Sequence, residues 1–279
     1  MKKRRWSQWL PNIPERLNSV SGIAGVGGTG MAVAGATAMT GIAATALTFG
    51  GIGLAAGAFG YAVYKAFPHA MHNANDLVGQ SVALSELSNV YPSLNKLAIL
   101  GPSRSGKTTL KNRLQFKTPT QQRTTAVTAT IVAIPTNPVS YLAVLDGGGE
   151  KFSQQFKIAE PADFLCLVVD HNTTDSSSEL CKERREETVK FMSQIREHLT
   201  ETECDRKRWI CVLANKRDLW ERLGDAKQTA FNEFVSAETD KWRNGNYSNS
   251  VTARRHSNEN VDDVSAFMDE LKPMNSGAN

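Results

Sequence analysis

Residues 101–109 read Gly-Pro-Ser-Arg-Ser-Gly-Lys-Thr-Thr, and no other stretch constrains the possible folds of this chain as strongly. The spacing Gly-x-x-x-x-Gly-Lys-Thr is that of a phosphate-binding loop, whose backbone N–H groups point inward at the start of a helix. Gly106 lets the backbone approach phosphate oxygens without an intervening Cβ. Lys107 supplies a cation for the β- and γ-phosphates, and the Thr108 hydroxyl can ligate Mg²⁺.

The sequence on both sides of this loop has the order strand, loop, helix. Residues 96–100 form a short apolar run typical of a buried strand, and Leu110 and Leu114 share one face of the helix expected next. A chance glycine-rich turn would not require these flanks. We therefore predict nucleotide binding by a set of loop residues, namely Gly101, Ser103, Arg104, Ser105, Gly106, Lys107, Thr108 and Thr109. Within this set, Arg104 either covers the phosphates or points to solvent.

Strand-like and helix-like segments alternate from residue 97 onward, which predicts an α/β fold with a mostly parallel sheet and helices on both faces. The apolar run 141–145 ends at Asp146, and residues 146–149 have the pattern Asp-x-x-Gly. An aspartate at the carboxyl end of a strand can hold Mg²⁺ through water, and the Gly149 N–H can meet a γ-phosphate.

A further motif, which would contact the nucleotide base, is Asn-Lys-Arg-Asp at residues 215–218, directly after the apolar run 209–214. The Asp218 carboxylate accepts two hydrogen bonds only from a base edge with two adjacent N–H donors, as guanine has and adenine lacks. Lys216 would lie along the base plane, and Asn215 would tie its loop to the phosphate loop. A weaker match at residues 250–254 places Thr252 and the Ala253 N–H near the guanine O6.

The N-terminal quarter has a different character, because residues 17–64 contain no charged residue. A membrane-spanning helix needs about 20 apolar residues, so this segment has room for two. Basic residues at the start favour a cytoplasmic N-terminus, and two spans would keep the nucleotide-binding part on the same side. We predict a transmembrane helical hairpin over residues 17–65, in contact with membrane lipid. The alternative is a low-complexity segment that inserts loosely or re-enters.

Charge and cysteine usage limit the classes of partner. Residues 1–16 hold five basic residues against one acidic residue, which equals the net charge of +4 of the whole chain, so the remainder is neutral. A neutral body lacks the basic face that nucleic-acid binding requires. The four cysteines, at positions 166, 181, 204 and 211, have neither Cys-x-x-Cys pairing nor a histidine at ligand spacing. We interpret them as reduced thiols rather than as a zinc site or a disulfide framework.

The motifs, in this order over residues 96–272, resemble those of the small Ras-like GTPases. Residues 146–150, 168–170 and 213–219 look most like the Arf-like branch. An N-terminal anchor combined with the loop at residues 101–108 is similar to the signal recognition particle receptor β subunit, although that subunit would be expected to have one span rather than a hairpin.

This resemblance implies a GTP- and Mg²⁺-dependent phosphohydrolase. In the family, a threonine of the first switch closes over Mg²⁺. Thr124, Thr125 and Thr128 all lie in the right interval, and we choose Thr125 because the strand-like run 129–134 follows at a suitable distance. The implied metal ligands are therefore Thr108, Thr125 and Asp146. The catalytic residues implied are Lys107, Gly149 and Glu150. The family usually has a glutamine at this last position to orient the attacking water. A carboxylate there repels the γ-phosphate, which implies slow hydrolysis and an activating partner.

Together these features predict a membrane-anchored switch that binds GTP or GDP with Mg²⁺, with its GTPase domain on the cytoplasmic side and a protein effector or activator as partner. The expected organisation is a basic start at 1–16, the membrane segment at 17–65, a linker at 66–95, the GTPase domain at 96–272 and a flexible tail at 273–279. Two alternatives remain open: a receptor that holds GTP without hydrolysing it, and a membrane effector whose glycine-rich hairpin oligomerises when GTP triggers it.

Overall fold

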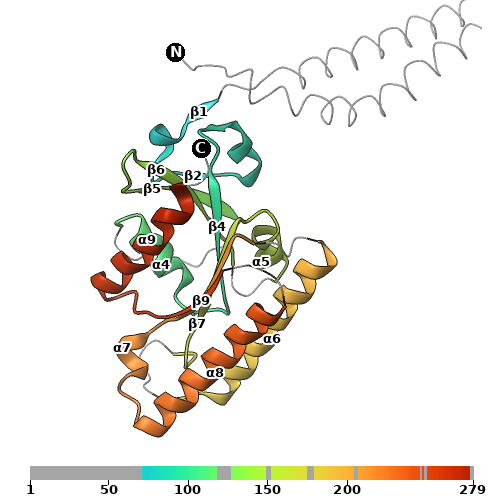
Figure 1. The fold of residues 1–279 in the computed structure, drawn as a ribbon, viewed down its shortest axis with the longest axis vertical. Coiled ribbons are helices and arrows are strands. Elements are labelled where there is room, and N and C mark those ends of the chain that lie inside the picture. Colours follow the sequence, from blue (N-terminus) through green and yellow to red (C-terminus); the bar gives the residue numbers. More distant parts are fainter. Residues whose placement is uncertain are drawn as a thin grey trace, which may run out of the picture. The chain divides into compact units, whose positions relative to one another are not determined.

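The computed structural model of the 279-residue chain describes residues 71–117, 127–148, 152–174, 179–203, 207–245, 247 and 250–276 (Figure 1). The chain divides into two compact units, Met1–His72 and Asn73–Asn279. The second unit contains the helices and the large sheet described below.

A seven-stranded sheet forms the centre of this unit. Its order is β2 (Ser81–Val82), β5 (Thr128–Ile134), β6 (Ser140–Asp146), β4 (Asn95–Leu100), β7 (Phe164–Val169), β8 (Trp209–Ala214) and β9 (Val251–Arg255). The five strands from β6 to β9 are parallel, whereas β5 pairs antiparallel with both β2 and β6. The predicted α/β fold with a mostly parallel sheet is confirmed.

Short elements precede the central strand β4. They are β1 (His72–Asn73), the 3₁₀ helices η2 (Ala74–Leu77) and η3 (Leu84–Asn89), and β3 (Val90–Tyr91), and β1 and β3 form a two-stranded ladder. Buried Ala74 and Val90 pack against Ile131 of β5. Part of the predicted linker 66–95 therefore packs against the sheet of the second unit.

Helices cover both faces of the sheet because its strands are apolar on both sides. On one face, Leu97 and Ile99 of β4 cluster with residues of α4 (Lys107–Leu114) and α9 (Val261–Ser276). On the other, Ala98 and Leu100 cluster with residues of α5 (Phe152–Ala159), α6 (Lys182–Glu201) and α8 (Asp225–Asn244). The single-turn helix α7 (Arg217–Trp220) follows β8.

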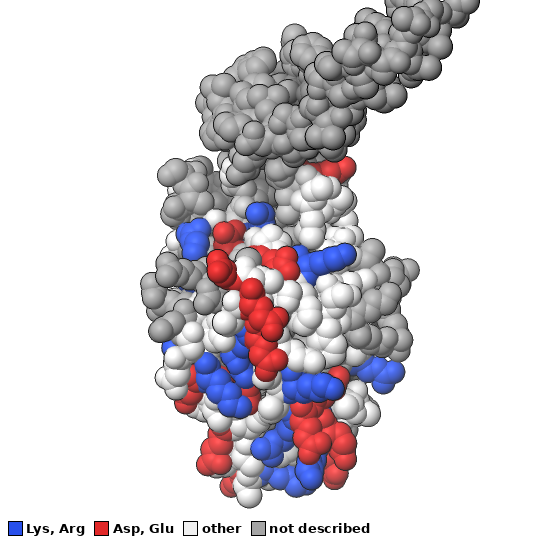
Figure 2. Space-filling view, turned by 90° about the vertical axis from the view of Figure 1, so that its right-hand side faces the viewer, with Lys and Arg blue, Asp and Glu red and all other residues white. Residues whose placement is uncertain are grey.

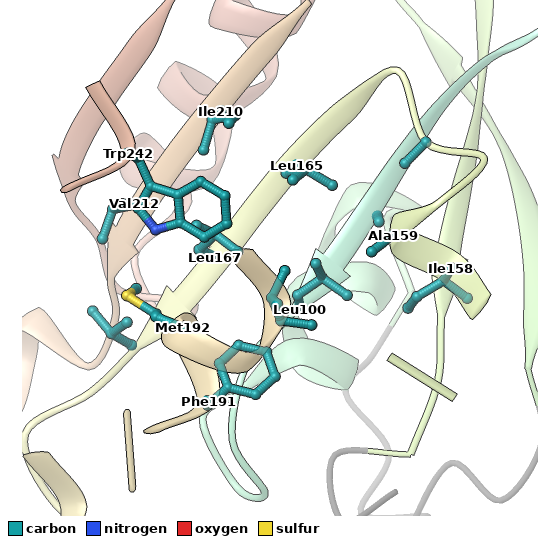
Figure 3. Packing of buried hydrophobic residues seen from close by; sticks show 14 of the residues in the cluster. Leu100, Ile158, Ala159, Leu165, Leu167, Phe191, Met192, Ile210, Val212 and Trp242 are labelled. Atoms are coloured by element: carbon teal, nitrogen blue, oxygen red, sulfur yellow. The ribbon is translucent and has the colours of Figure 1, made fainter. Parts of the chain in front are cut away.

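The face of the sheet under α5, α6 and α8 carries the larger cluster of buried side chains. Figure 3 shows Leu167 of β7 near Trp242 of α8 and Met192 of α6, with Leu165 further along the strand. Alternate strand residues point to opposite faces, so one strand supplies both layers of the core. This packing fixes the carboxyl ends of the parallel strands, and the candidate site lies at that edge.

Basic and acidic side chains are intermixed on the surface. Figure 2 shows both signs of charge on one face of the molecule, with acidic side chains running along its middle. Several of the ion pairs are exposed contacts within a single helix, such as Lys182 with Glu186 and Arg243 with Asp240. Pairs of this kind contribute little to folding stability.

The predicted transmembrane hairpin requires correction. In the described part of the chain, we find no helix with both the length and the apolar character that a membrane crossing needs. The hairpin over residues 17–65 and the integral-membrane localisation are therefore not supported. Residues 17–64 carry no charge, but they are rich in Gly, Ala and Thr and poor in Leu and Phe, so their apolar character is weak. Residues 1–70, with the predicted basic start, lie outside the described residues.

Candidate functional site

The sequence motifs meet at one edge of the sheet, where the parallel strands end. Residues 101–106 follow β4, Asp146 ends β6, Asp170 follows β7, residues 215–218 follow β8 and residues 256–258 follow β9. From β4 the chain passes through α4 and β5 to β6 on one side, and then through α5 to β7 on the other side. Such a reversal of strand order is where open α/β sheets bind their ligands.

The phosphate loop has a backbone that only glycine tolerates at two positions. Gly106, at the N-terminus of α4, has a φ of 96°, and a Cβ there would lie 2.2 Å from Nδ2 of Asn215. Gly101 has a φ of 156°, and a Cβ there would lie 2.4 Å from the carbonyl oxygen of Val168. Arg104 also has a positive φ, of 61°, and its side chain is exposed. The two glycines of the motif are therefore required by close packing as well as by backbone conformation.

Lys107 is the first residue of α4 and its side chain is buried in the loop. Its Nζ donates hydrogen bonds to the carbonyl oxygens of Gly101 at 2.8 Å and Pro102 at 2.6 Å. Burial, with a smaller contribution from the nearby Arg184 charge, lowers the pKa of Lys107 from 10.5 to about 8, while Asp146 and other carboxylates oppose the shift. A desolvated cation beside the N-terminus of a helix is suited to a phosphate group, which would favour its charged form.

Two asparagine amides hold the phosphate loop from the neighbouring strand ends. Nδ2 of Asn215 donates to the Ser105 carbonyl oxygen at 2.8 Å, and Nδ2 of Asn258 donates to the Gly106 carbonyl oxygen at 2.9 Å. The structure thus places Asn215 against the phosphate loop, in the position expected from the sequence. Asn258 was not predicted, although it lies at the end of the next parallel strand.

Asp218 lies on α7, beside the loop after β9. Its carboxylate oxygen Oδ1 accepts a hydrogen bond from the Ser257 Oγ at 2.6 Å, and the residue is otherwise exposed. Ser257 is itself held, because its backbone N–H donates to Oδ2 of Asp263 at 2.8 Å. The residue after Ser257 is Asn258, which contacts Gly106, so Asp218 and the phosphate loop are joined through two adjacent residues.

The two residues that the weaker match at residues 250–254 predicted to lie near the base are instead part of a strand. Thr252 and Ala253 are inside β9, paired with Cys211 and Val212 of β8, and the strand continues to Arg255. The sequence analysis matched residues 250–254 to a loop that follows the last strand, whereas Val251–Arg255 form β9 itself. Ser257 and Asn258 lie at this edge of the sheet instead. The serine shortly after the strand is the sequence feature that could have indicated them.

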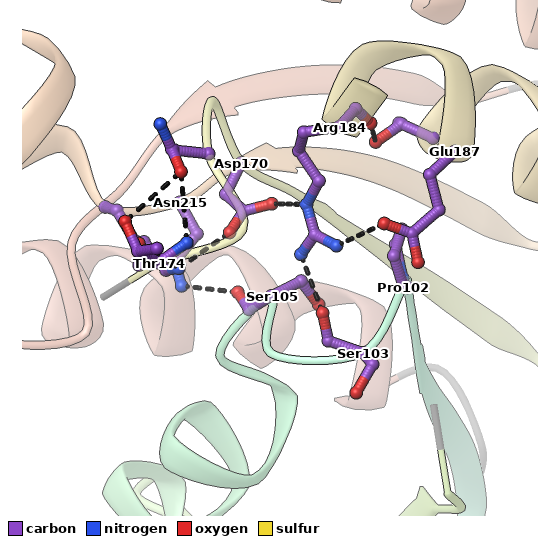
Figure 4. A network of polar contacts seen from close by, with 12 residues as sticks. Pro102, Ser103, Ser105, Asp170, Thr174, Arg184, Glu187 and Asn215 are labelled. Carbon is purple, nitrogen blue, oxygen red and sulfur yellow. Dashed lines mark hydrogen bonds and ion pairs between the residues drawn. The ribbon is translucent and has the colours of Figure 1, made fainter. Parts of the chain in front are cut away.

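Lys216 adopts a left-handed backbone conformation with a φ of 59°, and its ammonium group points to Asp170. Nζ of Lys216 lies 2.7 Å from Oδ2 of Asp170, whose Oδ1 accepts from Nε of Arg184 (Figure 4). Arg184 is 1% exposed and also binds Oε2 of Glu187 and the carbonyl oxygen of Ser103, at 2.7 and 2.8 Å. This network connects the loop at residues 215–218, the phosphate loop and the start of α6. Sequence reasoning missed the roles of Asp170 and Arg184.

Asp146 is fully buried at the end of β6, and its Oδ2 lies 2.7 Å from Nζ of Lys111 on α4. The next turn is held by Gln154, whose Oε1 accepts from the Gly148 N–H at 2.7 Å. No cluster of three acidic, histidine or cysteine residues suited to a metal ion occurs among the described residues. Asp146 and Thr108 carry oxygens suited to Mg²⁺, but the ammonium group of Lys111 lies against Oδ2 of Asp146, so a divalent ion does not fit at that oxygen as the residues are arranged.

Three predicted residues lie outside the described part of the chain. These are Thr125, the implied switch ligand, and Gly149 and Glu150, the implied catalytic pair. Ser103 contributes its carbonyl oxygen to Arg184, and Ser105 contributes its own to Asn215. The described part of the predicted nucleotide site is therefore assembled from five strand ends.

Comparison with known proteins gives only distant likenesses. No family model and no curated protein matches this chain. A bacterial selenocysteine-specific elongation factor, EF-Sec, is similar at 17% identity with a TM-score of 0.46, over 67% of this chain and 29% of that one. A mutation variant of SsGBP is similar at 19% identity with a TM-score of 0.45, over 66% of this chain and 56% of that one. The chain thus matches less than two thirds of either structure, and its function is argued from the site alone.

A buried histidine at the site makes folding sensitive to acid. His256 lies beside Asn258, with its Nε2 3.0 Å from Oδ1 of that residue, and burial lowers its pKa from 6.5 to about 4. Since the folded protein keeps this side chain neutral while the unfolded chain protonates near pH 6.5, stability is complete above pH 6.5 and falls as the pH drops toward 4.

We expect the free energy of unfolding to fall by about 2 kcal/mol more in the wild type than in His256→Gln between about pH 7 and about pH 5. Denaturant titrations of both proteins at several pH values would measure this difference, with about pH 8 as the reference where the histidine is neutral in both states. Parallel pH profiles for the two proteins would show that His256 is not held neutral in the fold.

Proposed function

We propose that this chain binds guanine nucleotides at the carboxyl edge of its parallel sheet and acts as a GTP-binding switch. The observation that carries the proposal is the connection between Asp218 and the phosphate loop. Ser257 holds the Asp218 carboxylate, and the adjacent Asn258 binds the carbonyl oxygen of Gly106. The residue that would read the base and the residues that would bind the phosphates therefore share one rigid frame.

The phosphate end of the proposed site rests on Lys107 and the N-terminus of α4. The buried ammonium group donates to two loop carbonyls, and burial makes its charged form less favourable, as its lowered pKa indicates. A phosphate would provide an opposite charge at the point where backbone N–H groups of the helix start are directed. Binding would therefore offset the desolvation that the folded chain imposes on Lys107.

The base end of the proposed site rests on Asp218. An exposed carboxylate on a one-turn helix would be commonplace, but Ser257 and Asp263 fix its surroundings by hydrogen bonds of 2.6 and 2.8 Å. A fixed carboxylate discriminates between bases because adenine cannot donate two hydrogen bonds to it, which leaves a desolvated acceptor unpaired. Lys216 would contribute its aliphatic stem to the base plane while Asp170 holds its ammonium group.

Hydrolysis of GTP, a requirement for an activating protein and membership of the Arf-like branch are finer parts of the proposal. They are supported by the order of the motifs along the chain. The family's glutamine is replaced here by Glu150, and a carboxylate beside a γ-phosphate supports slow turnover without a partner. The same residue motivates the second candidate, a receptor that holds GTP without hydrolysing it.

Replacing Asp218 with asparagine tests the assignment of the base. The new amide keeps one acceptor oxygen but replaces the other with an NH₂ donor, so guanine loses the hydrogen bond from its 2-amino group and meets a second donor there. Xanthine has a carbonyl oxygen at that position, which accepts from the new amide. We expect the variant Asp218→Asn to bind GDP about 10²-fold more weakly and to prefer xanthosine diphosphate. Equilibrium titration of the full chain with both nucleotides measures the change.

Asp225→Asn, which alters an exposed aspartate at the start of α8, is the matched control and should behave as the wild type. If Asp218→Asn binds GDP as the wild type does, Asp218 does not read the base, and the proposed guanine specificity is incorrect.

Replacing Glu150 with glutamine separates the switch from the non-hydrolysing receptor. A neutral amide removes the repulsion of the γ-phosphate and can orient water, so Glu150→Gln should hydrolyse GTP about tenfold faster than a slow but measurable wild type. Single-turnover hydrolysis with excess protein measures both rates, and Glu233→Gln on the exposed side of α8 is the control. A wild type with no detectable turnover, activated only by this substitution, would favour the receptor.

A further inference from the structure

Lys111 and Asp146 form an ion pair at the place where the sequence motifs predict a divalent cation. Nζ of Lys111 lies 2.7 Å from Oδ2 of Asp146, and the two side chains are 13% and 1% exposed. The pair joins helix α4 to the end of β6, the strand beside β4. It is thus part of the site edge and largely removed from solvent.

Lys111 lies on the same face of α4 as Lys107, while its ammonium group contacts Asp146. It lies four residues after Lys107, so both side chains leave the helix on the same face. Long side chains on a helix lean toward its N-terminus, which here is the phosphate loop. Two ammonium groups are therefore stacked on one side of α4, one held by loop carbonyls and the other by a carboxylate.

A divalent cation at Oδ2 of Asp146 would have to displace the Lys111 ammonium group from that oxygen. The exchange would break an existing ion pair and would also require Mg²⁺ to lose water, which it does reluctantly. A divalent ion also requires several oxygen ligands, and the described residues offer no cluster of three acidic, histidine or cysteine groups around Asp146. The arrangement favours the resident ammonium group over an incoming ion.

We propose that Lys111 acts as a built-in cation at Asp146, which makes binding of guanine nucleoside diphosphate by this chain largely independent of divalent metal. The inference rests on the proposed function, since it concerns how the same site neutralises the phosphates. Lys111 is a positioning residue in this scheme: it fixes the Asp146 carboxylate and supplies the positive charge that Mg²⁺ would otherwise bring.

The test compares the affinity of the full chain for a fluorescent GDP analogue in excess magnesium and in excess EDTA. The wild type should bind with affinities that agree within about threefold in the two buffers. Lys111→Met, which keeps the length of the side chain but removes its charge, should bind at least about tenfold more weakly in EDTA than in magnesium. Lys111→Arg keeps the charge and should remain metal-independent.

Lys227→Met is the matched control, because it removes an exposed lysine of α8 and should reproduce the wild-type ratio. A second readout is the binding of Mn²⁺ to the GDP complex, measured by electron paramagnetic resonance, which should be weak in the wild type and stronger in Lys111→Met. Thermal unfolding establishes that each variant is folded, and the wild-type and Lys111→Arg measurements decide the question if Lys111→Met does not fold.

A wild type that loses about tenfold or more in affinity in EDTA overturns the inference while leaving guanine binding intact. The same holds if wild type and Lys111→Met depend equally on magnesium. Absence of GDP binding by the wild type in both buffers would overturn the proposed function and this inference together.

Discussion

The close contact between Gly106 and two asparagine side chains is the constraint on which the site depends. A Cβ at Gly106 would lie 2.2 Å from Nδ2 of Asn215 and 2.8 Å from Nδ2 of Asn258. Because glycine stands there, the amide of Asn258 reaches the Gly106 carbonyl oxygen, and the amide of Asn215 reaches that of Ser105. The start of α4 is thereby attached to the ends of β8 and β9, and the proposed phosphate and base regions become one unit.

Buried charges at the same edge have a second role. Asp170 is paired with Arg184 and Lys216, and Asp146 is paired with Lys111. Buried ion pairs add little net stability relative to apolar packing, but breaking one by removing a partner is costly. These pairs therefore restrain the arrangement of the loops more than they stabilise the fold. The apolar clusters on both faces of the sheet supply that stability and hold the strand ends in place.

The motifs with a strict local spacing could be recognised in the sequence. The phosphate loop, Asp146 at the end of its strand and Asn215 beside the phosphate loop all lie where local patterns placed them. Contacts between distant segments could not be inferred in this way. The pairs of Lys111 with Asp146 and of Arg184 with Asp170 depend on packing of helices against strand ends, which leaves no periodic signal.

Two errors had identifiable physical causes. Residues 250–254 were matched to a loop motif, whereas Val251–Arg255 form a strand at the edge of the sheet, where arginines are tolerated because their charged ends can reach solvent. The predicted hairpin rested on an uncharged segment whose small side chains make it only weakly apolar.

The central claim is that one edge of the sheet selects guanine over adenine while binding phosphate. Calorimetric titration of the full chain with GDP and with ADP tests it most directly. The account predicts that GDP binds at least about 10²-fold more tightly than ADP, since adenine would leave the Asp218 carboxylate unpaired. Equal affinity for the two nucleotides, tighter binding of ADP or no binding of either would contradict it.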